Sequence, residues 1–244
     1  MRMLVVLPAA RGVYPDEAAQ RRIDRIRSYS RPGLEVEADY PAARSGFSPW
    51  GGADTAPGMA RNHQIIAERM VQAEKEGYDA VSGFGMLDFG VEIARSLVNI
   101  PVIGQTQATY AMASMMAERI GVISYGSWTH SYHYRQMKDY GFLHLLVGLG
   151  AAEIPNNEMP KRREELYERF VSEGKRLVAA GAELIVCHGM SMSPIEYPAS
   201  EFAAGIGVPV LDGLTCAIAM AQAWVSAGTP YSRARHPLHK DQGL

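Results

Sequence analysis

The sequence has only two cysteines among its 244 residues, Cys187 and Cys216, so no framework of disulfides holds it together. Such sparse cysteine is typical of a reducing compartment, and we expect a cytoplasmic protein. No apolar run approaches the ~20 residues that span a bilayer, and the run at residues 3–7 is too short for a signal-peptide core. Excess charge is missing as well, since 24 basic residues face 26 acidic ones. This balance gives no footprint for nucleic acid or an anionic membrane.

Motifs that bind cofactors are also missing. The sequence contains no Walker-type phosphate loop and no GxGxxG after its first apolar run. His130 and His133 could share a helix face, but no third metal ligand lies near them in the sequence. We therefore expect no metal and no nucleotide.

What the sequence does have is an internal repeat. Residues 77–86 (GYDAVSGFGM) align without a gap with residues 181–190 (GAELIVCHGM), and IPV at 100–102 echoes VPV at 208–210. Self-similarity over such a long period indicates a duplicated structural unit. Each copy is predicted to contain a strand, a loop, a helix, a second strand and a second helix.

Apolar runs of strand length alternate with helical patterns, without hairpin signals between them. This alternation is typical of βαβ units with parallel sheets. We predict an α/β fold with two pseudo-symmetric three-layer lobes, short parallel sheets and an active-site cleft between the lobes. The first lobe is expected to hold residues 1–103 plus 213–244, and the second residues 104–212. Asp16 and Thr106 are expected to cap helices over 17–29 and 108–118, and a further helix is expected over 88–97.

Candidate site residues follow from the ends of the expected strands. Ligands of parallel sheets bind at the carboxyl ends of strands, where backbone N–H groups and helix N-termini converge. In the second repeat, a thiol, an imidazole and a hydroxyl follow the expected strand 184–186. Other candidates lie in the loop after the first strand, in the long polar segment 40–60, before the helix at 108–118 and after the strand 120–123: Pro8, Arg44, Thr106 and Tyr125.

Taken together, several segments resemble the aspartate/glutamate racemase superfamily, most closely its hydantoin-racemase-like branch. They are GYDAV at 77–81, residues 90–97, IPVIG at 100–104, residues 181–190 and GVPVLDG at 207–213. The likeness covers most of residues 60–225. It implies a two-lobed homo-oligomeric enzyme that needs neither metal nor organic cofactor. In the racemases of this superfamily, one cysteine from each lobe acts on opposite faces of the acidic carbon of a small substrate.

The chain departs from that pattern at the cysteines themselves. The first repeat has none, and Gly83 and Gly85 are the candidates for that position. In the second repeat, an ungapped match puts the family cysteine on Gly189, whereas shortening the strand end by two residues puts it on Cys187. We favour Cys187, because the same adjustment serves both repeats.

Racemisation through two bases needs a proton donor on one face of the carbon and an acceptor on the other. We expect a cofactor-independent isomerase acting on a small carboxylate or cyclic imide, with Cys187 and His188 as catalytic candidates. His188 is expected to point to the opposite face of its strand from Cys187. The substrate-binding candidates are Pro8, Arg44, Gly83, Gly85, Met86, Thr106, Tyr125, Gly189, Met190 and Ser191.

Other functions stay open at this point. With at most one thiol, the chain also resembles one-cysteine decarboxylase-like members of the superfamily, and a hydrolase could use the same oxyanion pocket. A two-lobed binding protein that has lost catalysis is a third alternative. The environment of Cys187 decides among them, because loop N–H groups favour a thiolate whereas burial opposes it. Cys216, in an apolar helix, is interpreted as core.

Overall fold

The computed structural model describes the chain except residues 9–11, 13–14, 43–55 and 239–244. The described residues form two compact units. Unit 1 contains residues 1–104 and 217–244, and unit 2 contains residues 105–216. Each unit has a four-stranded, all-parallel sheet, so the predicted α/β fold is confirmed. Arg44 lies outside the described residues.

The sheet of unit 1 has the strand order β2-β1-β3-β4. Its elements in chain order are β1 (Arg2–Val6), α1 (Asp16–Arg27), β2 (Glu35–Asp39), α2 (Ala56–Lys75), β3 (Ala80–Gly83), α3 (Val91–Arg95) and β4 (Val102–Ile103), and α8 (Gly213–Ala227) contributes its residues from 217 onward. Side chains of β1, β3 and β4 pack with α2 and α3 into one apolar core. Burial of this apolar surface is the main force that holds the unit together.

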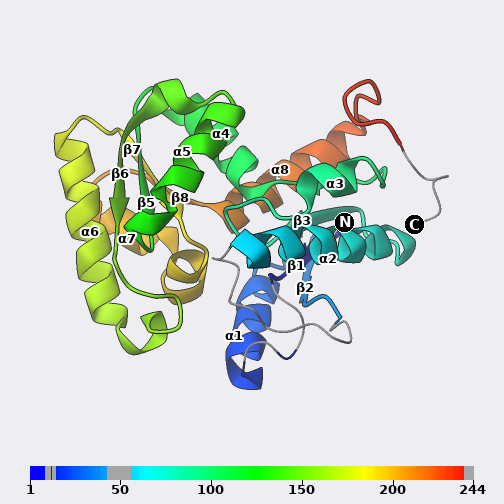
Figure 1. Cartoon of the computed structure of the whole chain (residues 1–244), viewed down its shortest axis with the longest axis horizontal. Coiled ribbons are helices and arrows are strands. Elements are labelled where there is room, and N and C mark those ends of the chain that lie inside the picture. Colours follow the sequence, from blue (N-terminus) through cyan, green and yellow to red (C-terminus); the bar gives the residue numbers. More distant parts are fainter. Residues whose placement is uncertain (9–11, 13–14, 43–55, 239–244) are drawn as a thin grey trace. The chain divides into compact units, whose positions relative to one another are not determined.

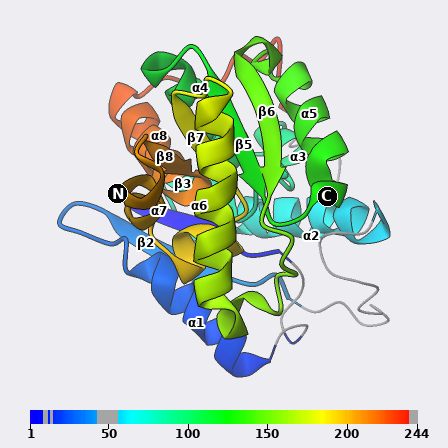
Figure 2. The ribbon, with the colours of Figure 1, turned by 90° about the vertical axis from the view of Figure 1, so that its left-hand side faces the viewer.

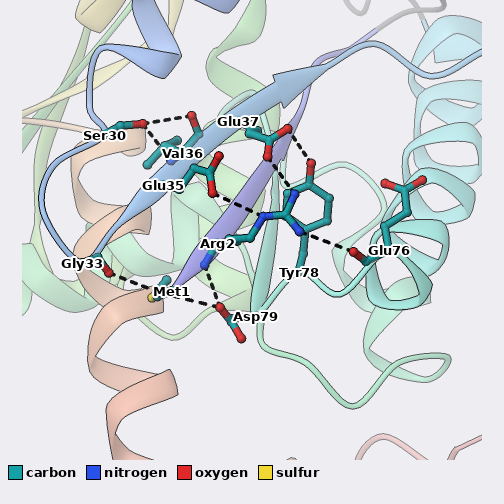
Figure 3. A network of polar contacts seen from close by, with 10 residues as sticks. All are labelled: Met1, Arg2, Ser30, Gly33, Glu35, Val36, Glu37, Glu76, Tyr78 and Asp79. Atoms are coloured by element: carbon teal, nitrogen blue, oxygen red, sulfur yellow. Dashed lines mark hydrogen bonds and ion pairs between the residues drawn. The ribbon is translucent and has the colours of Figure 1, made fainter.

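A polar network ties the amino end of this sheet (Figure 3). The Arg2 guanidinium donates to Glu37 Oε1 at 2.9 Å and lies 4.5 Å from the centre of the Tyr78 ring. Tyr78 in turn donates to Glu37 Oε2 at 2.7 Å, and the Arg2 amide donates to Asp79 at 2.7 Å. Burial, followed by Glu37, raises the pKa of Tyr78 to about 12. These contacts join β1, β2 and the start of β3, so this end of the sheet has a structural role.

Unit 2 has the strand order β6-β5-β7-β8. Its helices and strands are α4 (Gln105–Met116), β5 (Ile120–Ser124), α5 (His130–Asp139), β6 (Leu146–Ala151), α6 (Arg163–Ala179), β7 (Leu184–His188), α7 (Ala199–Ile206) and β8 (Val210–Asp212). Three single 3-10 turns, at Ser127–Thr129, Leu143–Leu145 and Met159–Lys161, and a π-turn at Ser191–Glu196 complete it. Helices α6 and α7 cover one face of the sheet, and α4 and α5 lie on the other (Figures 1 and 2).

The sequence analysis missed β6, and it gave no bounds for α7, the helix that it expected between the two strands of the second repeat. Strand β6 lies at the edge of its sheet, pairs with β5 only and includes Gly148 and Gly150, so its apolar pattern is weak. Helix α7 has only eight residues and lies between Pro198 and the left-handed Gly207, which ends it. Both elements are set by packing in unit 2 more than by local sequence.

The expected helix starts were also wrong in places. Helix α1 begins at Asp16 itself, after Pro15, and no side chain caps it. Thr106 lies inside α4 with its side chain buried, so it is not a cap. The helix expected over 88–97 is shorter in the structure, where α3 covers only Val91–Arg95, because Asp88 and Gly90 adopt φ values of 50° and 75°. A helix cannot include residues in that left-handed region.

Candidate active site

The two repeats end in matching strands. The amide of Val81 in β3 donates to Pro101 at 2.9 Å, and that of Ile185 in β7 donates to Pro209 at 2.9 Å. Val81 pairs with Val102 and Ile185 with Val210, so the sequence repeat continues into the register of the sheets. The loops that follow β3 and β7 therefore leave equivalent strands at the carboxyl edge, where parallel sheets bind ligands.

In unit 1 the loop after β3 is built around glycine. Gly83 is buried in the strand, and a Cβ there would lie 2.7 Å from the carbonyl oxygen of Phe89. Gly85 has φ 137° and is half-buried, and a Cβ there would lie 3.7 Å from the Phe89 ring. Met86 is buried. A thiol at position 83 would push into the core of unit 1, whereas position 85 lies at the surface of the loop.

The same loop carries a carboxylate that the sequence analysis did not single out. Asp88 is buried and holds a left-handed backbone conformation, which is strained for a residue other than glycine. Its carboxylate fills the space beside Gly104, where a Cβ would lie 2.6 Å from Asp88 Oδ2. The nearby Gly90 was the signal in the sequence, because a glycine directly before a short helix marks a loop with a special conformation.

In unit 2 the thiol of Cys187 is fully buried in the core between β7 and helices α6 and α7. Burial is the main cause that raises the pKa of the thiol, and the charge of Asp212 adds to it. The backbone of Gly189 and Ser193 lowers the pKa, as expected from the loop, but by less than burial raises it. The thiol lies 3.6 Å from the Gly189 carbonyl oxygen, to which it donates. Of the two opposing effects named from the sequence, burial is the larger, and in this position Cys187 is kept as a neutral thiol.

His188 lies on the opposite face of β7 from Cys187, as strand alternation predicts. Its ring centre is 3.8 Å from that of His133 on α5 and 5.9 Å from that of Tyr110 on α4. Both imidazoles are buried, and their ring nitrogens have no hydrogen-bond partner among the described residues. Burial lowers the pKa of His133 to about 3, and lowers that of His188 as well. His188 is thus a neutral core residue in this structure, and it does not contact Cys187.

The remaining candidates of unit 2 lie around the loop after β7. A Cβ on Gly189 would lie 2.7 Å from the Met192 methyl group and 3.5 Å from the Tyr125 ring. Tyr125 is half-buried, and its ring stands edge-on to Trp128 at 5.5 Å. Met190 is buried, and Ser191 is half-buried at the start of the π-turn. Gly189, Tyr125 and Ser191 therefore meet at the carboxyl edge of this sheet.

The remaining observations concern the other candidate residues and possible metal ligands. Thr106 is buried in α4, and Pro8 is half-buried just beyond the end of β1. In the part of the chain that the structure describes, no three His, Cys, Asp or Glu side chains group in a way that could hold a metal ion. The hydroxyl of Ser193, fully buried in the π-turn, has no partner among the described residues.

Comparison with known proteins identifies the family. The family model for Asp/Glu/hydantoin racemases matches residues 48–221. The chain belongs to this family. It is 32% identical to a hydantoin racemase of Rhizobium meliloti over 189 residues, which cover 75% of this chain and 73% of that protein. The match begins within the long polar segment, in agreement with a resemblance that is weak over the first 60 residues.

Solved structures with low sequence identity share the fold. The allantoin racemase of Pseudomonas fluorescens superposes with a TM-score of 0.84 at 21% identity, covering 100% of this chain and 99% of that one. An arylmalonate decarboxylase superposes with a TM-score of 0.59 at 14% identity, covering 95% and 96%. The Asp/Glu/hydantoin racemase family membership makes this chain a racemase-like enzyme of the isomerase class. No helix among the described residues is both long enough and apolar enough to cross a membrane.

Proposed function

We propose that this enzyme racemises a small cyclic imide or ureide of the hydantoin type, by exchanging the proton on the acidic ring carbon. The observation that carries the proposal is the identity to a hydantoin racemase over three quarters of the chain. The repeated strand ends support it, because β3 and β7 present equivalent loops and racemisation uses one group for each face of the carbon.

The loops after β3 and β7 are the elements that we assign to substrate binding. In unit 1 the assigned residues are Gly85 and Met86, and in unit 2 they are Gly189, Ser191 and Tyr125. The Cβ position of Gly85 faces the Phe89 ring and that of Gly189 faces the Met192 methyl group, so both glycines pack their loops closely against the unit that carries them. Backbone amides and hydroxyl groups of such loops stabilise the oxyanion that forms when the ring carbon loses its proton.

A thiol-independent reaction fits the described geometry better than a thiol-dependent one. Cys187 is buried with a raised pKa, and unit 1 has a glycine at both candidate positions. Cys187 as the catalytic group remains a prediction, and its alanine variant tests it.

A one-cysteine lyase is the second candidate. The observation that favours it is that Gly83 in β3 and Cys187 in β7 occupy equivalent positions of the two repeats. The chain therefore has one thiol where a symmetric racemase has two. Such an enzyme removes carbon dioxide from a malonate and protonates the resulting enediolate on one face. It requires Cys187 to become accessible in the presence of substrate.

The test is a panel of single-enantiomer substrates, followed by chiral chromatography. We expect both enantiomers of a 5-substituted hydantoin to converge on the racemate faster than in enzyme-free buffer, which racemises hydantoins slowly by itself. Carbon dioxide release from an arylmalonate without racemisation of hydantoins would favour the lyase. Ring opening would favour a hydrolase, and binding without turnover would favour a binding protein. Size-exclusion chromatography with light scattering tests the homo-oligomer that the family resemblance predicts.

A further inference from the structure

His63, on the second turn of α2, is tied to the loop after β3. Its Nδ1 atom accepts a hydrogen bond of 3.1 Å from the Gly90 amide. This histidine is not among the candidate site residues named in the sequence analysis. The acceptor role of Nδ1 fixes the ring tautomer, because a neutral imidazole that accepts at Nδ1 carries its proton on Nε2.

The contact places the end of the loop directly on α2. Gly90 has φ 75°, and a Cβ there would lie 2.7 Å from the Ala67 amide nitrogen and 3.1 Å from the His63 carbonyl oxygen. Only glycine fits such a conformation at such close range. The backbone of the loop therefore packs tightly against the helix, and the His63–Gly90 hydrogen bond is a polar contact between them.

Phe89 carries this contact to the glycine end of the loop. Its ring stands edge-on to the His63 imidazole, with the ring centres 5.3 Å apart. The same ring lies 3.7 Å from the Cβ position of Gly85, and the Phe89 carbonyl oxygen lies 2.7 Å from that of Gly83. His63, Phe89 and Gly85 thus form one chain of contacts within unit 1. A shift of the imidazole would move the surface on which Gly85 rests.

We propose that His63 is a positioning residue that holds the Gly85–Gly90 loop in its reactive geometry, and that it does so only as a neutral imidazole. The proposal rests on the proposed function, since it gives this loop a part in substrate binding. Protonation would put an N–H on Nδ1, which then faces the Gly90 N–H as donor against donor. The loop would lose its anchor without any change in the residues that touch substrate.

The direction of the pH effect follows from the surroundings of the ring. Burial lowers the pKa of His63, so the neutral form prevails above the ~6.5 of a free imidazole and for some distance below it. The Phe89 ring and the Gly90 amide face the imidazole, and the charged groups on the adjoining segments are Arg61 on α2 and Asp88 in the loop. Activity is therefore present at neutral pH and is lost as the pH falls through the lowered pKa.

Two variants of the enzyme distinguish the loss of the hydrogen-bond acceptor at position 63 from the loss of the ring. In His63→Asn, the amide oxygen takes the place of Nδ1 and accepts from Gly90, but it does not titrate. In His63→Phe, a ring remains against Phe89 but no acceptor is left. His144→Asn, at an exposed histidine, is the matched control. For each protein, kcat and KM for hydantoin racemisation are measured from pH 4.5 to 8, together with the exchange protection of the Gly90 amide by NMR.

We expect His63→Phe to lower kcat/KM about tenfold at pH 7.5, the loss that corresponds to a single hydrogen bond, and to approach the wild type at acid pH, where protonated His63 has lost the same hydrogen bond. His63→Asn should keep wild-type activity at pH 7.5. Its activity should not show the decline at acid pH that protonation of His63 causes in the wild type. His144→Asn should match the wild type throughout. Wild-type activity in His63→Phe at pH 7.5, or an unchanged decline at acid pH in His63→Asn, would overturn the proposal.

The Gly90 protection factor keeps this test separate from the proposed function. If no substrate is racemised by any of the proteins, the proposed function fails. The anchoring itself is then judged by Gly90, whose protection should fall in His63→Phe and in wild-type enzyme at acid pH, but not in His63→Asn. Equal protection in all proteins at all pH values would overturn the anchoring whatever the substrate.

Discussion

The loops after β3 and β7 follow equivalent strands, but different side chains contact them. In unit 1 the loop is glycine-rich and contacts the half-buried His63, whose Nδ1 accepts a hydrogen bond from the Gly90 amide. In unit 2 the loop follows two buried residues on opposite faces of β7, Cys187 and His188, and neither imidazole nitrogen of His188 has a partner among the described residues.

The difference shows how a repeat can keep its backbone while its polar groups diverge. Strand pairing is preserved because it depends on backbone hydrogen bonds and on apolar side chains that both repeats share. The residues beyond the strand are free of that constraint. One loop has become an anchored glycine turn, and the other a π-turn packed around methionine and a buried thiol.

The largest effect that we predict concerns acid and unit 2. With a pKa lowered to about 3, His133 binds a proton in the unfolded chain at a pH where the folded chain does not. Stability is therefore highest above the ~6.5 of a free imidazole and falls as the pH drops toward 3, by on the order of 5 kcal/mol for this residue alone. His188 acts in the same direction.

Urea unfolding of the wild type and of His133→Phe between pH 4 and 8 measures this effect. The variant removes two buried, unpaired ring nitrogens, so we expect it to be at least as stable as the wild type at pH 7 and to lose less stability in acid. His144→Phe, at an exposed site, is the control and should follow the wild type. Parallel pH profiles for all three proteins would refute the role of the pair.

A smaller effect is expected from the glycine of the anchored loop. Gly90→Ala adds a Cβ at a positive φ and within 2.7 Å of backbone, so we expect a loss of about 3 kcal/mol and a weaker contact with His63. Gly207→Ala, with φ 96° and no atom within 4 Å of the added Cβ, carries only the conformational strain. It should cost about 1 kcal/mol. Chemical denaturation compares the two, and equal losses would show that the close approach to α2 does not matter.

The smallest effect is expected at the buried thiol. Cys187→Ala removes one buried atom, and we expect a loss of about 1 kcal/mol with racemisation within about threefold of the wild type. In the native state, iodoacetamide should label neither Cys187 nor Cys216, because burial raises the pKa of both thiols. Loss of turnover in Cys187→Ala, with Cys216→Ala fully active, would instead establish thiol catalysis.

The sequence predicts the strands and the repeat well because both depend on local apolar patterns. Residues 184–186 are a buried strand in both the sequence and the structure. The opposite orientations of Cys187 and His188 follow from strand alternation alone. The sequence could not show which side chains from other elements pack against these strands and bury their residues. The close, tilted contact between the His188 and His133 rings depends on α5 packing against β7, and these residues lie far apart in the chain.

The site was harder to predict for the same reason. His63 and Gly90 are 27 positions apart, and only the fold shows that one accepts from the other. Asp88 was interpreted as the start of a helix, since neither its positive φ nor its fit beside Gly104 is visible in the residue pattern. Arg44 remains a prediction, because it lies in the part of the chain outside the described residues.

Proton exchange at the substrate's ring carbon tests the central claim most directly. The purified enzyme is incubated in deuterated buffer with each enantiomer of a 5-substituted hydantoin, and deuterium at the ring carbon is followed by NMR alongside the enantiomeric excess. We predict that deuterium enters from both enantiomers at rates well above the enzyme-free control, and that enantiomeric excess decays as it does so. Deuterium uptake equal to the control for both enantiomers would contradict the assignment of this chain as a hydantoin-type racemase.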